Sequence, residues 1–121
     1  MLARRATPIY LVEDIDDARM RYIALGFVPR ETSDDGCVGV SAGQTTVILL
    51  NHEYAERTLP ARAVALLEEK PALYVWVESL EDMRGELRDT FIGEAKLAGM
   101  REWAVESPQG LMVFAEASRP H

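Results

Sequence analysis

Apolar and polar positions alternate along the chain in a pattern that predicts short strands separated by amphipathic helices. The apolar run at 8–12, PIYLV, predicts the first strand. Asp14 then offers an N-cap oxygen, and Asp17 adds an acid in the first turn, where amides are unpaired. Gly26 can end the helix in a left-handed conformation. Apolar side chains of this helix recur at spacings of 3, 4 and 3 along one stripe: Ile15, Ala18, Tyr22 and Leu25.

The same pattern returns 65 residues later, which indicates an internal repeat. Residues 12–19 read VEDIDDAR and residues 77–84 read VESLEDMR, with identity at four of eight positions. The run at 72–77, ALYVWV, predicts a strand, Ser79 is the expected helix cap, and Asp82 is the matching first-turn acid. The expected apolar stripe of this second helix is Leu80, Met83, Leu87 and Phe91.

Three further strand-like segments follow each predicted helix. They lie at 27–32, 36–42 and 45–51 in the first half, and at 94–98, 101–107 and 111–117 in the second. Ser107-Pro108-Gln109-Gly110 predicts a turn, with proline and glycine at the positions that favour them. Both halves therefore have the order β-α-β-β-β.

We predict an α+β fold in which two tandem β-α-β-β-β units form a single domain over residues 1–121. Unit one covers about residues 5–52 and unit two covers about residues 71–117. The linker at 53–70 contains a short helix, because the stretch from 61 to 70 is helix-like and Pro60 suits its first turn.

This duplicated unit resembles the vicinal-oxygen-chelate superfamily, which includes glyoxalase I, the bleomycin-resistance proteins and ring-cleaving dioxygenases. The resemblance rests on PIYLVEDIDDARMRYIALGF at the opening strand and helix, and on MREWAVESPQGLMVFAEA at the closing hairpin. The turn of that hairpin departs from the usual Asp-Pro-Asp-Gly-Asn, because it keeps the proline and glycine but loses the acids. The resemblance implies a curved mixed sheet around a cleft, and a homodimer.

Enzymes of that superfamily hold a metal with His and Glu side chains on the cleft side of the first and last strands of each unit. Carrying those four positions over gives Thr7, Leu49, Ala72 and Phe114. None of the four is a good ligand for a divalent metal, and the chain has only two histidines. We therefore expect no metal and no other cofactor, which disfavours the metal-dependent glyoxalase, fosfomycin-resistance and dioxygenase activities.

The same positions assign alternate strand residues to the cleft, which would then be apolar and aromatic, as small-molecule sites usually are. Trp76 could stack on a planar or cationic ligand. It could equally fill the space of a metal site or pack at a subunit interface. The candidate ligand-binding residues are Trp76, Tyr74, Leu49, Phe114, Met112, Ile9 and Trp103.

Charge narrows the choice of partners. The formal net charge of −7 argues against binding to nucleic acid or to anionic membranes. It is compatible with a cationic ligand, although acidity also serves solubility. No apolar run is long enough to span a bilayer. Cys37 is the only cysteine, so no internal disulfide can form, and we expect a cytoplasmic protein.

Three functions remain open at this point. The leading hypothesis is a homodimeric, metal-free protein that sequesters a hydrophobic or cationic aromatic small molecule, by resemblance to the bleomycin-resistance proteins. The second is a metal-independent isomerase or lyase, which would need an acid–base pair such as His52 with Glu116 or Glu102. The third is a structural or regulatory module without a ligand, whose cleft is filled by its own aromatic side chains.

Overall fold

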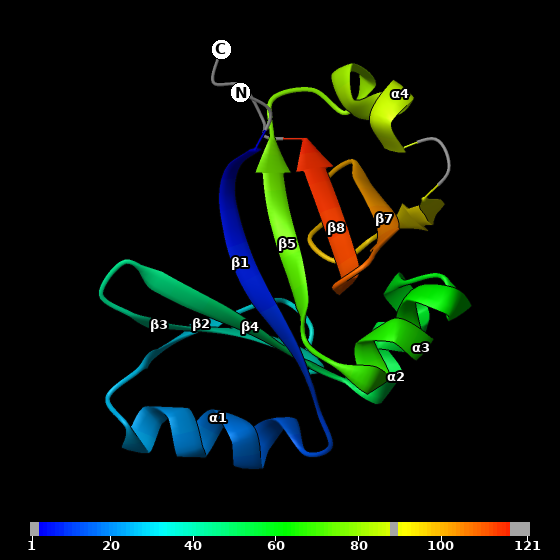
Figure 1. Ribbon diagram of the computed structural model, residues 1–121. Coiled ribbons are helices and arrows are strands. Elements are labelled where there is room, and N and C mark those ends of the chain that lie inside the picture. The colour runs from blue at the N-terminus through cyan, green and yellow to red at the C-terminus, as the bar shows by residue number, and fades with distance from the viewer. Residues whose placement is uncertain (1–2, 88–89, 117–121) are drawn as a thin grey trace.

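The computed structural model describes residues 3–87 and 90–116 (Figure 1). The first half contains β1 (Ala3–Val12), α1 (Ile15–Ala24), β2 (Val28–Glu31), β3 (Cys37–Ala42) and β4 (Thr45–Asn51). Two helices follow, α2 (His52–Thr58) and α3 (Ala61–Glu69). The second half contains β5 (Ala72–Val77), the 3-10 turn η1 (Glu81–Met83), α4 (Arg84–Leu87), β6 (Phe91–Ala95), β7 (Glu102–Ser107) and β8 (Gly110–Glu116). No helix among these residues is both long and apolar enough to cross a membrane.

The strands of the described residues form one mixed sheet in the order β2-β3-β4-β1-β5-β8-β7-β6. β1 is parallel to β4 and β5 is parallel to β8, whereas the other neighbouring pairs are antiparallel. The antiparallel β1–β5 pair joins the two halves in the middle of the sheet. Figure 1 shows the sheet bent there, with its two halves running in different directions. The predicted fold class, an α+β protein with a curved mixed sheet, is confirmed.

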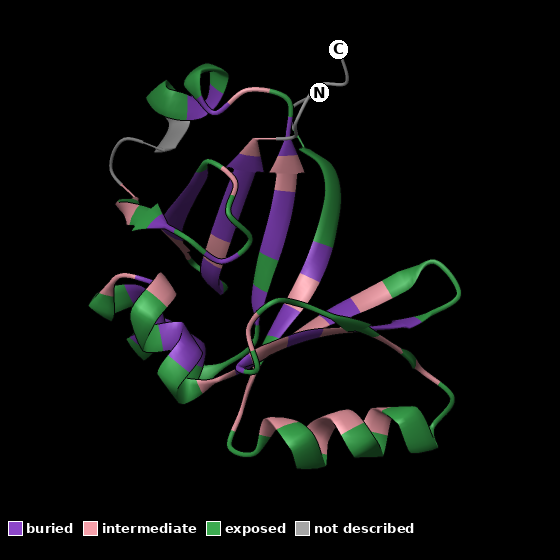
Figure 2. Cartoon of the chain, turned by 180° about the vertical axis from the view of Figure 1, so that it is seen from behind, coloured by how far each residue is buried: buried purple, intermediate pink, exposed green. Residues whose placement is uncertain are grey.

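Different helices cover the two faces of this sheet. α2 and α3 pack on the inner, concave face, where the largest apolar cluster includes Ile9, Leu66 and Val113. On the outer face, α1 packs over a second cluster around Val40, and η1 packs over a third around Val105. Figure 2 shows that buried residues follow the central strands, whereas α1 carries none. The concave face is therefore the only described face on which side chains from both halves and the linker meet in one cluster.

α1 begins and ends where the sequence predicts. Asp14 is its N-cap, and Oδ1 of Asp14 accepts a hydrogen bond of 3.0 Å from the Asp17 amide. Gly26 has a φ of 98°, the left-handed conformation predicted for the end of the helix. The predicted stripe packs against the outer cluster except for Leu25, which is 76% exposed because the helix ends one residue before it.

The second predicted helix is reduced to η1 and one turn of α4. η1 starts after Leu80 without a side-chain cap, so the prediction that Ser79 caps a helix is wrong. The first two residues of the predicted stripe are buried, but Phe91 belongs to β6 and is 47% exposed. The side chain of Leu87 lies outside the described part of the chain. Gly85 lies inside this segment and weakens a helix there, because glycine costs about 1 kcal/mol relative to alanine.

The sequence pattern does not predict α2, which starts directly after β4. Asn51 ends the strand and caps the helix, since its Oδ1 accepts a hydrogen bond of 2.9 Å from the Tyr54 amide. Glu53 adds an acid in the first turn, where it meets the positive end of the helix dipole. An asparagine at the end of a strand-like run was therefore the signal for this helix. α3 agrees with the predicted helix at 61–70.

β6 occupies Phe91–Ala95, three residues before the predicted segment at 94–98. The shift has a local cause. The amides of Leu97 and Ala98 donate to the side chain of Glu102 instead of to a neighbouring strand. The residues after Ala95 therefore form a loop that folds back over the concave face.

Candidate ligand-binding cleft

Strand pairing decides which residues face the concave side. In the parallel pairs, Ile9 lies opposite Ile48, and Tyr74 lies opposite Val113. Residues paired in this way point to the same face of a sheet, and residues one position along point to the other. Ile9, Tyr74 and Val113 belong to the concave cluster. It follows that Leu49 points to the outer face.

The predicted cleft position is wrong for four candidate residues. Leu49 packs in the outer cluster beneath α1. Phe114, Met112 and Trp103 pack in the outer cluster beneath η1. Matching the two halves at an offset of 65 residues could not reveal the error, because a shift of one residue moves both copies to the wrong face together.

The other three candidates lie on the concave face. Ile9 is fully buried in its cluster. Tyr74 is also buried, and the Trp76 ring lies against it edge to face, with 5.2 Å between the ring centroids. Trp76 is half-buried at the margin of the same cluster. Whether Trp76 contacts a ligand stays a prediction.

A cleft of about 660 Å³ opens on the concave face between the two halves. Its walls come from the strands β2, β3, β4 and β5, the loop between β2 and β3, helix α2, and the loop between β6 and β7. Tyr74 is the one predicted candidate that lines it. The residues that carry the site are otherwise ones that the sequence analysis did not single out for binding: Asp34, Ile48, Tyr54, Arg57, Lys96 and Leu97.

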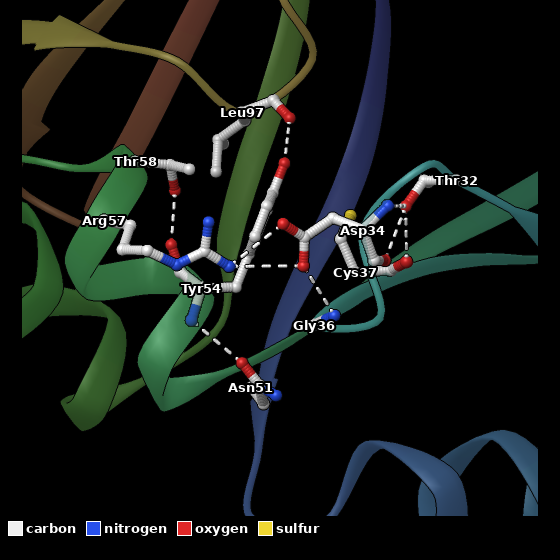
Figure 3. Close-up of polar contacts among 9 residues, drawn as sticks. All are labelled: Thr32, Asp34, Gly36, Cys37, Asn51, Tyr54, Arg57, Thr58 and Leu97. Atoms are coloured by element: carbon white, nitrogen blue, oxygen red, sulfur yellow. Dashed lines mark hydrogen bonds and ion pairs between the residues drawn. The ribbon is translucent and has the colours of Figure 1, made fainter.

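Helix α2 supplies one wall of the cleft, and its position depends on close packing around Gly36. A Cβ on Gly36 would lie 2.7 Å from Cβ of Tyr54 and 2.8 Å from Oδ1 of Asn51, so only glycine fits there. The hydroxyl of Tyr54 donates a hydrogen bond to the carbonyl of Leu97 across the cleft (Figure 3). Helix α2 is thereby tied to both halves of the sheet.

The loop between β2 and β3 forms the facing wall. Oδ1 of Asp34 accepts a hydrogen bond of 2.8 Å from the Gly36 amide, and the Arg57 guanidinium lies 3.0 and 3.2 Å from its two carboxylate oxygens (Figure 3). The hydrogen bond from Gly36 and the guanidinium of Arg57 both lower the pKa of Asp34. Arg57 also lies over the Tyr54 ring, 5.4 Å from its centroid. Arg57 is therefore already held by Asp34 of this loop and by the Tyr54 ring of its own helix.

Glu102 holds the opposite end of the cleft in place and is only 2% exposed. Its carboxylate accepts hydrogen bonds from the Tyr74 hydroxyl at 2.7 Å, the Leu97 amide at 2.6 Å and the Ala98 amide at 2.8 Å. A buried carboxylate is tolerated when donors surround it in this way. The three bonds fix the loop between β6 and β7 against β5.

Cys37, Tyr54 and Tyr74 form the inner wall of the cleft, and their side chains stay uncharged near neutral pH. Burial raises the pKa of the Cys37 thiol to about 11 and that of the Tyr54 hydroxyl to about 12. The pKa of Tyr74 is raised as well, first by burial and then by its hydrogen bond to Glu102. The wall therefore offers neutral polar groups and aromatic rings, and Cys37 is a thiol rather than a reactive thiolate.

Comparison with solved structures identifies the fold. The chain is similar to a glyoxalase/bleomycin resistance protein/dioxygenase superfamily member from Vibrio splendidus 12B01, at 18% identity and a TM-score of 0.65, over 97% of this chain and 100% of that one. The chain has the glyoxalase/bleomycin-resistance fold. It is also similar to a hypothetical protein from Bacillus halodurans, at 13% identity, a TM-score of 0.63 and coverage of 98% and 99%. It is similar as well to an uncharacterized protein from Methanosarcina mazei, at 17% identity and a TM-score of 0.57, over 100% of this chain and 98% of that one. No protein-family model and no curated protein matches the chain.

The positions carried over from metal-dependent members of the superfamily do not converge in this version of the glyoxalase/bleomycin-resistance fold. Thr7 and Ala72 are on the concave side, since they pair with Tyr74 and Ile9, but Leu49 and Phe114 are on the outer side. The concave neighbours of those two residues are aliphatic. Within residues 3–87 and 90–116, no group of three or more His, Cys, Asp or Glu residues could hold a metal ion.

The acid–base pair considered for a metal-independent enzyme is not assembled. His52 lies at the exposed start of α2, with Nδ1 2.8 Å from Glu56 and Nε2 3.7 Å from Glu68. Glu116 accepts a hydrogen bond from the Leu80 amide, beside the outer cluster. Glu102 is enclosed by its own three donors on the concave side. The two acids proposed as partners of His52 therefore lie on different faces of the sheet.

Proposed function

We propose that the chain binds a small, partly apolar organic molecule in the cleft between its two halves. The observation that carries this proposal is the cleft of about 660 Å³ on the concave face. Small-molecule sites are concave, mostly apolar and about 300–1,000 Å³ in volume, with a few fixed polar groups. The rings of Tyr54 and Tyr74 and the side chain of Ile48 offer apolar contact, and the fixed loops around them provide the polar groups.

The protonation and hydrogen bonding of the side chains at the cleft wall fit a binding site better than an acid–base catalytic site. An enzyme of the isomerase or lyase type needs a base with a free lone pair near the substrate and a pKa near the working pH. Cys37 and Tyr54 keep their protons near neutral pH. Glu102 is only 2% exposed and already accepts three hydrogen bonds. We therefore favour a binding protein over a metal-independent enzyme.

The two tryptophans of the chain allow a direct test. Trp76 lies against Tyr74, which lines the cleft, whereas Trp103 lies on the outer face beside Arg84 and Arg101. We would titrate a panel of aromatic acids, amines and alcohols into Trp103→Phe, whose fluorescence comes from Trp76 alone. A ligand bound in the cleft should change that emission with saturation.

Trp76→Phe is the matched control, because its remaining fluorophore, Trp103, is separated from the cleft by the sheet. The same ligand should leave its emission nearly unchanged while calorimetry still detects binding. A panel without any saturable binding would contradict the proposal. An equal response of the two variants would place the ligand elsewhere. The homodimer and the cytoplasmic location stay predictions, and light scattering tests the first.

A further inference from the structure

We infer that the molecule bound in the cleft carries an anionic group, a carboxylate or a phosphate, which is held by Arg30 and Lys96. This inference rests on the proposed function and specifies the chemical class of the ligand. It differs from the hydrophobic or cationic aromatic ligand of the leading hypothesis, with which the net charge of −7 is compatible. The charges that line the cleft differ from those of the whole chain.

Five charged residues line the cleft: Arg30, Glu31, Asp34, Arg57 and Lys96. Both acids already have a cationic partner. Oε1 of Glu31 lies 2.6 Å from Nε of Arg19, and Asp34 binds the Arg57 guanidinium. Among the charged residues that line the cleft, only Arg30 and Lys96 have no oppositely charged partner within the described part of the protein, so these two cations can pair with a ligand.

Cations without an ion pair are the minority in the described part of this chain. Most of its arginines and lysines lie within 4.0 Å of a carboxylate oxygen. Within residues 3–87 and 90–116, those that form no ion pair are Arg5, Arg30, Lys70 and Lys96. Two of these four line the same cleft. An acidic chain that leaves two cations free at one cleft has a local preference for an anion.

The two cations come from opposite halves of the molecule. Arg30 is in β2, where it pairs with Gly39 of β3. Lys96 follows β6, and its amide donates a hydrogen bond of 2.8 Å to the carbonyl of Thr58 on α2. The backbones of both residues are thus fixed by strand or helix contacts, while their side chains are exposed and free to turn toward a ligand.

The inner wall sets the orientation of the ligand. The hydroxyl of Tyr54 donates to the Leu97 carbonyl (Figure 3). The hydroxyl of Tyr74 donates to Glu102. Both hydroxyl protons are therefore already used, and only ring surface and oxygen lone pairs are left to contact a ligand. These groups, and the buried carboxylate behind Tyr74, disfavour an anion deep inside. We therefore place the apolar body of the ligand against the tyrosines and its anionic group at the rim, beside Arg30 and Lys96.

The acidic surface does not cancel this preference at ordinary salt. Charges in water are screened over about 8 Å at 0.15 M ionic strength. An anion in contact with Arg30 and Lys96 feels those two charges fully, and the distant acids only weakly. Measurements at 0.15 M salt therefore isolate the contacts in the cleft.

The test compares three probes that share one ring system: 2-naphthoate, 2-naphthalenemethanol and 2-naphthylmethylamine. We expect calorimetry at 0.15 M salt to rank their affinities in the order acid, alcohol, amine. Arg30→Gln and Lys96→Gln should each weaken naphthoate binding by roughly 3- to 10-fold, as expected for partly exposed charged contacts. The double variant should bind acid and alcohol equally, and the affinity for the alcohol should stay unchanged throughout.

Arg21→Gln is the control, because it removes the same charge from α1 on the outer face. It should leave the affinities for all three probes unchanged. The inference is overturned if the amine binds best, if acid and alcohol bind equally to the unmodified chain, or if naphthoate binding survives both substitutions. The inference is also overturned if none of the three probes binds. The proposed function is tested separately, by the panel of aromatic acids, amines and alcohols and the fluorescence of Trp76.

Discussion

At the scale of single residues, the thiol of Cys37 gives the most direct check on the cleft wall. Burial raises its pKa to about 11 from an ordinary 9.0. Because only the thiolate attacks an alkylating reagent, its reactive fraction at pH 8 is about 100-fold below that of a free cysteine. We expect iodoacetamide to modify the folded chain about 100-fold more slowly than the chain unfolded in urea. The rate should rise about tenfold per pH unit up to about pH 11.

The same shift links Cys37 to stability. The thiol is neutral when protonated, and its folded pKa lies above its unfolded pKa. Its contribution to folding is therefore complete below about pH 9 and is lost as the pH rises through 11. Rapid alkylation of the folded chain at pH 7, with no further increase at higher pH, would contradict the raised pKa of this half-buried thiol. Because Cys37 is the only cysteine, the modification can be followed by mass alone.

Residue-scale reasoning from the sequence placed Tyr74 on the correct face, but it did not predict that Glu102 is buried and holds a loop. Tyr74 lies two residues after Ala72 in β5, so it shares the face that the superfamily's ligand position assigns to Ala72. Glu102 begins a strand, where a charged residue is usually exposed. Its burial depends on the Tyr74 hydroxyl, 28 residues away in sequence, and on two amides of a loop whose path no periodicity records. Polar contacts between segments that are distant in sequence are therefore the part of the site that the pattern of apolar and polar residues does not predict.

At the scale of elements, Gly36 decides where α2 lies. Gly36→Ala would bring a Cβ to 2.7 Å from Tyr54 and 2.8 Å from the Asn51 side chain that caps the helix. Either the loop or the start of α2 must then move. We expect a loss of about 1–3 kcal/mol in the free energy of unfolding, as for overpacked interiors, together with weaker ligand binding.

Gly85→Ala is the matched control for that substitution, because nothing lies within 4 Å of the added Cβ and the residue is in helix α4. It should raise the free energy of unfolding by up to about 1 kcal/mol. Urea unfolding followed by circular dichroism compares the two variants. Equal effects of the two substitutions would show that α2 does not depend on close packing at Gly36.

The positions of helices along the chain were predicted more reliably than which strand residues face the cleft. Cap residues and spacings located α1 and α3, because both signals are local. The faces of β4 and β8 were assigned one residue out of register, since an apolar strand buried on both sides shows no alternation to fix it. Ile48 and Leu49 are equally apolar, and only the pairing of Ile48 with Ile9 shows which of them faces the cleft.

At the scale of the whole molecule, β1 and β5 join the two halves into one sheet, and the linker helices pack in its concave angle. The resemblance to the superfamily implied this curved sheet, but not the place of the helices that join the halves. Because α2 and α3 occupy part of the concave face, the cleft that remains is lined by two loops, by residues of β2 to β5 and by α2. The shape of the site is therefore a property of the assembled chain.

This arrangement predicts that the two halves unfold together. The concave cluster takes Ile9 and Leu50 from the first half, Leu66 from α3, and Tyr74 and Val113 from the second half. If one half opened, it would expose apolar surface on the other, so we expect a single cooperative transition. Tryptophan fluorescence reports only the second half, where both tryptophans lie, whereas far-ultraviolet circular dichroism reports both halves. The two urea curves should coincide.

Leu66→Ala tests the coupling through the linker, because Leu66 is buried in the shared cluster but belongs to neither half of the sheet. A buried leucine replaced by alanine typically lowers the free energy of unfolding by about 2–5 kcal/mol. If the halves are coupled through α3, both probes should shift to the same lower urea midpoint. A shift confined to one probe, or two separate midpoints in the unmodified chain, would mean that each half carries its own core and that the cleft lies between independently unfolding parts.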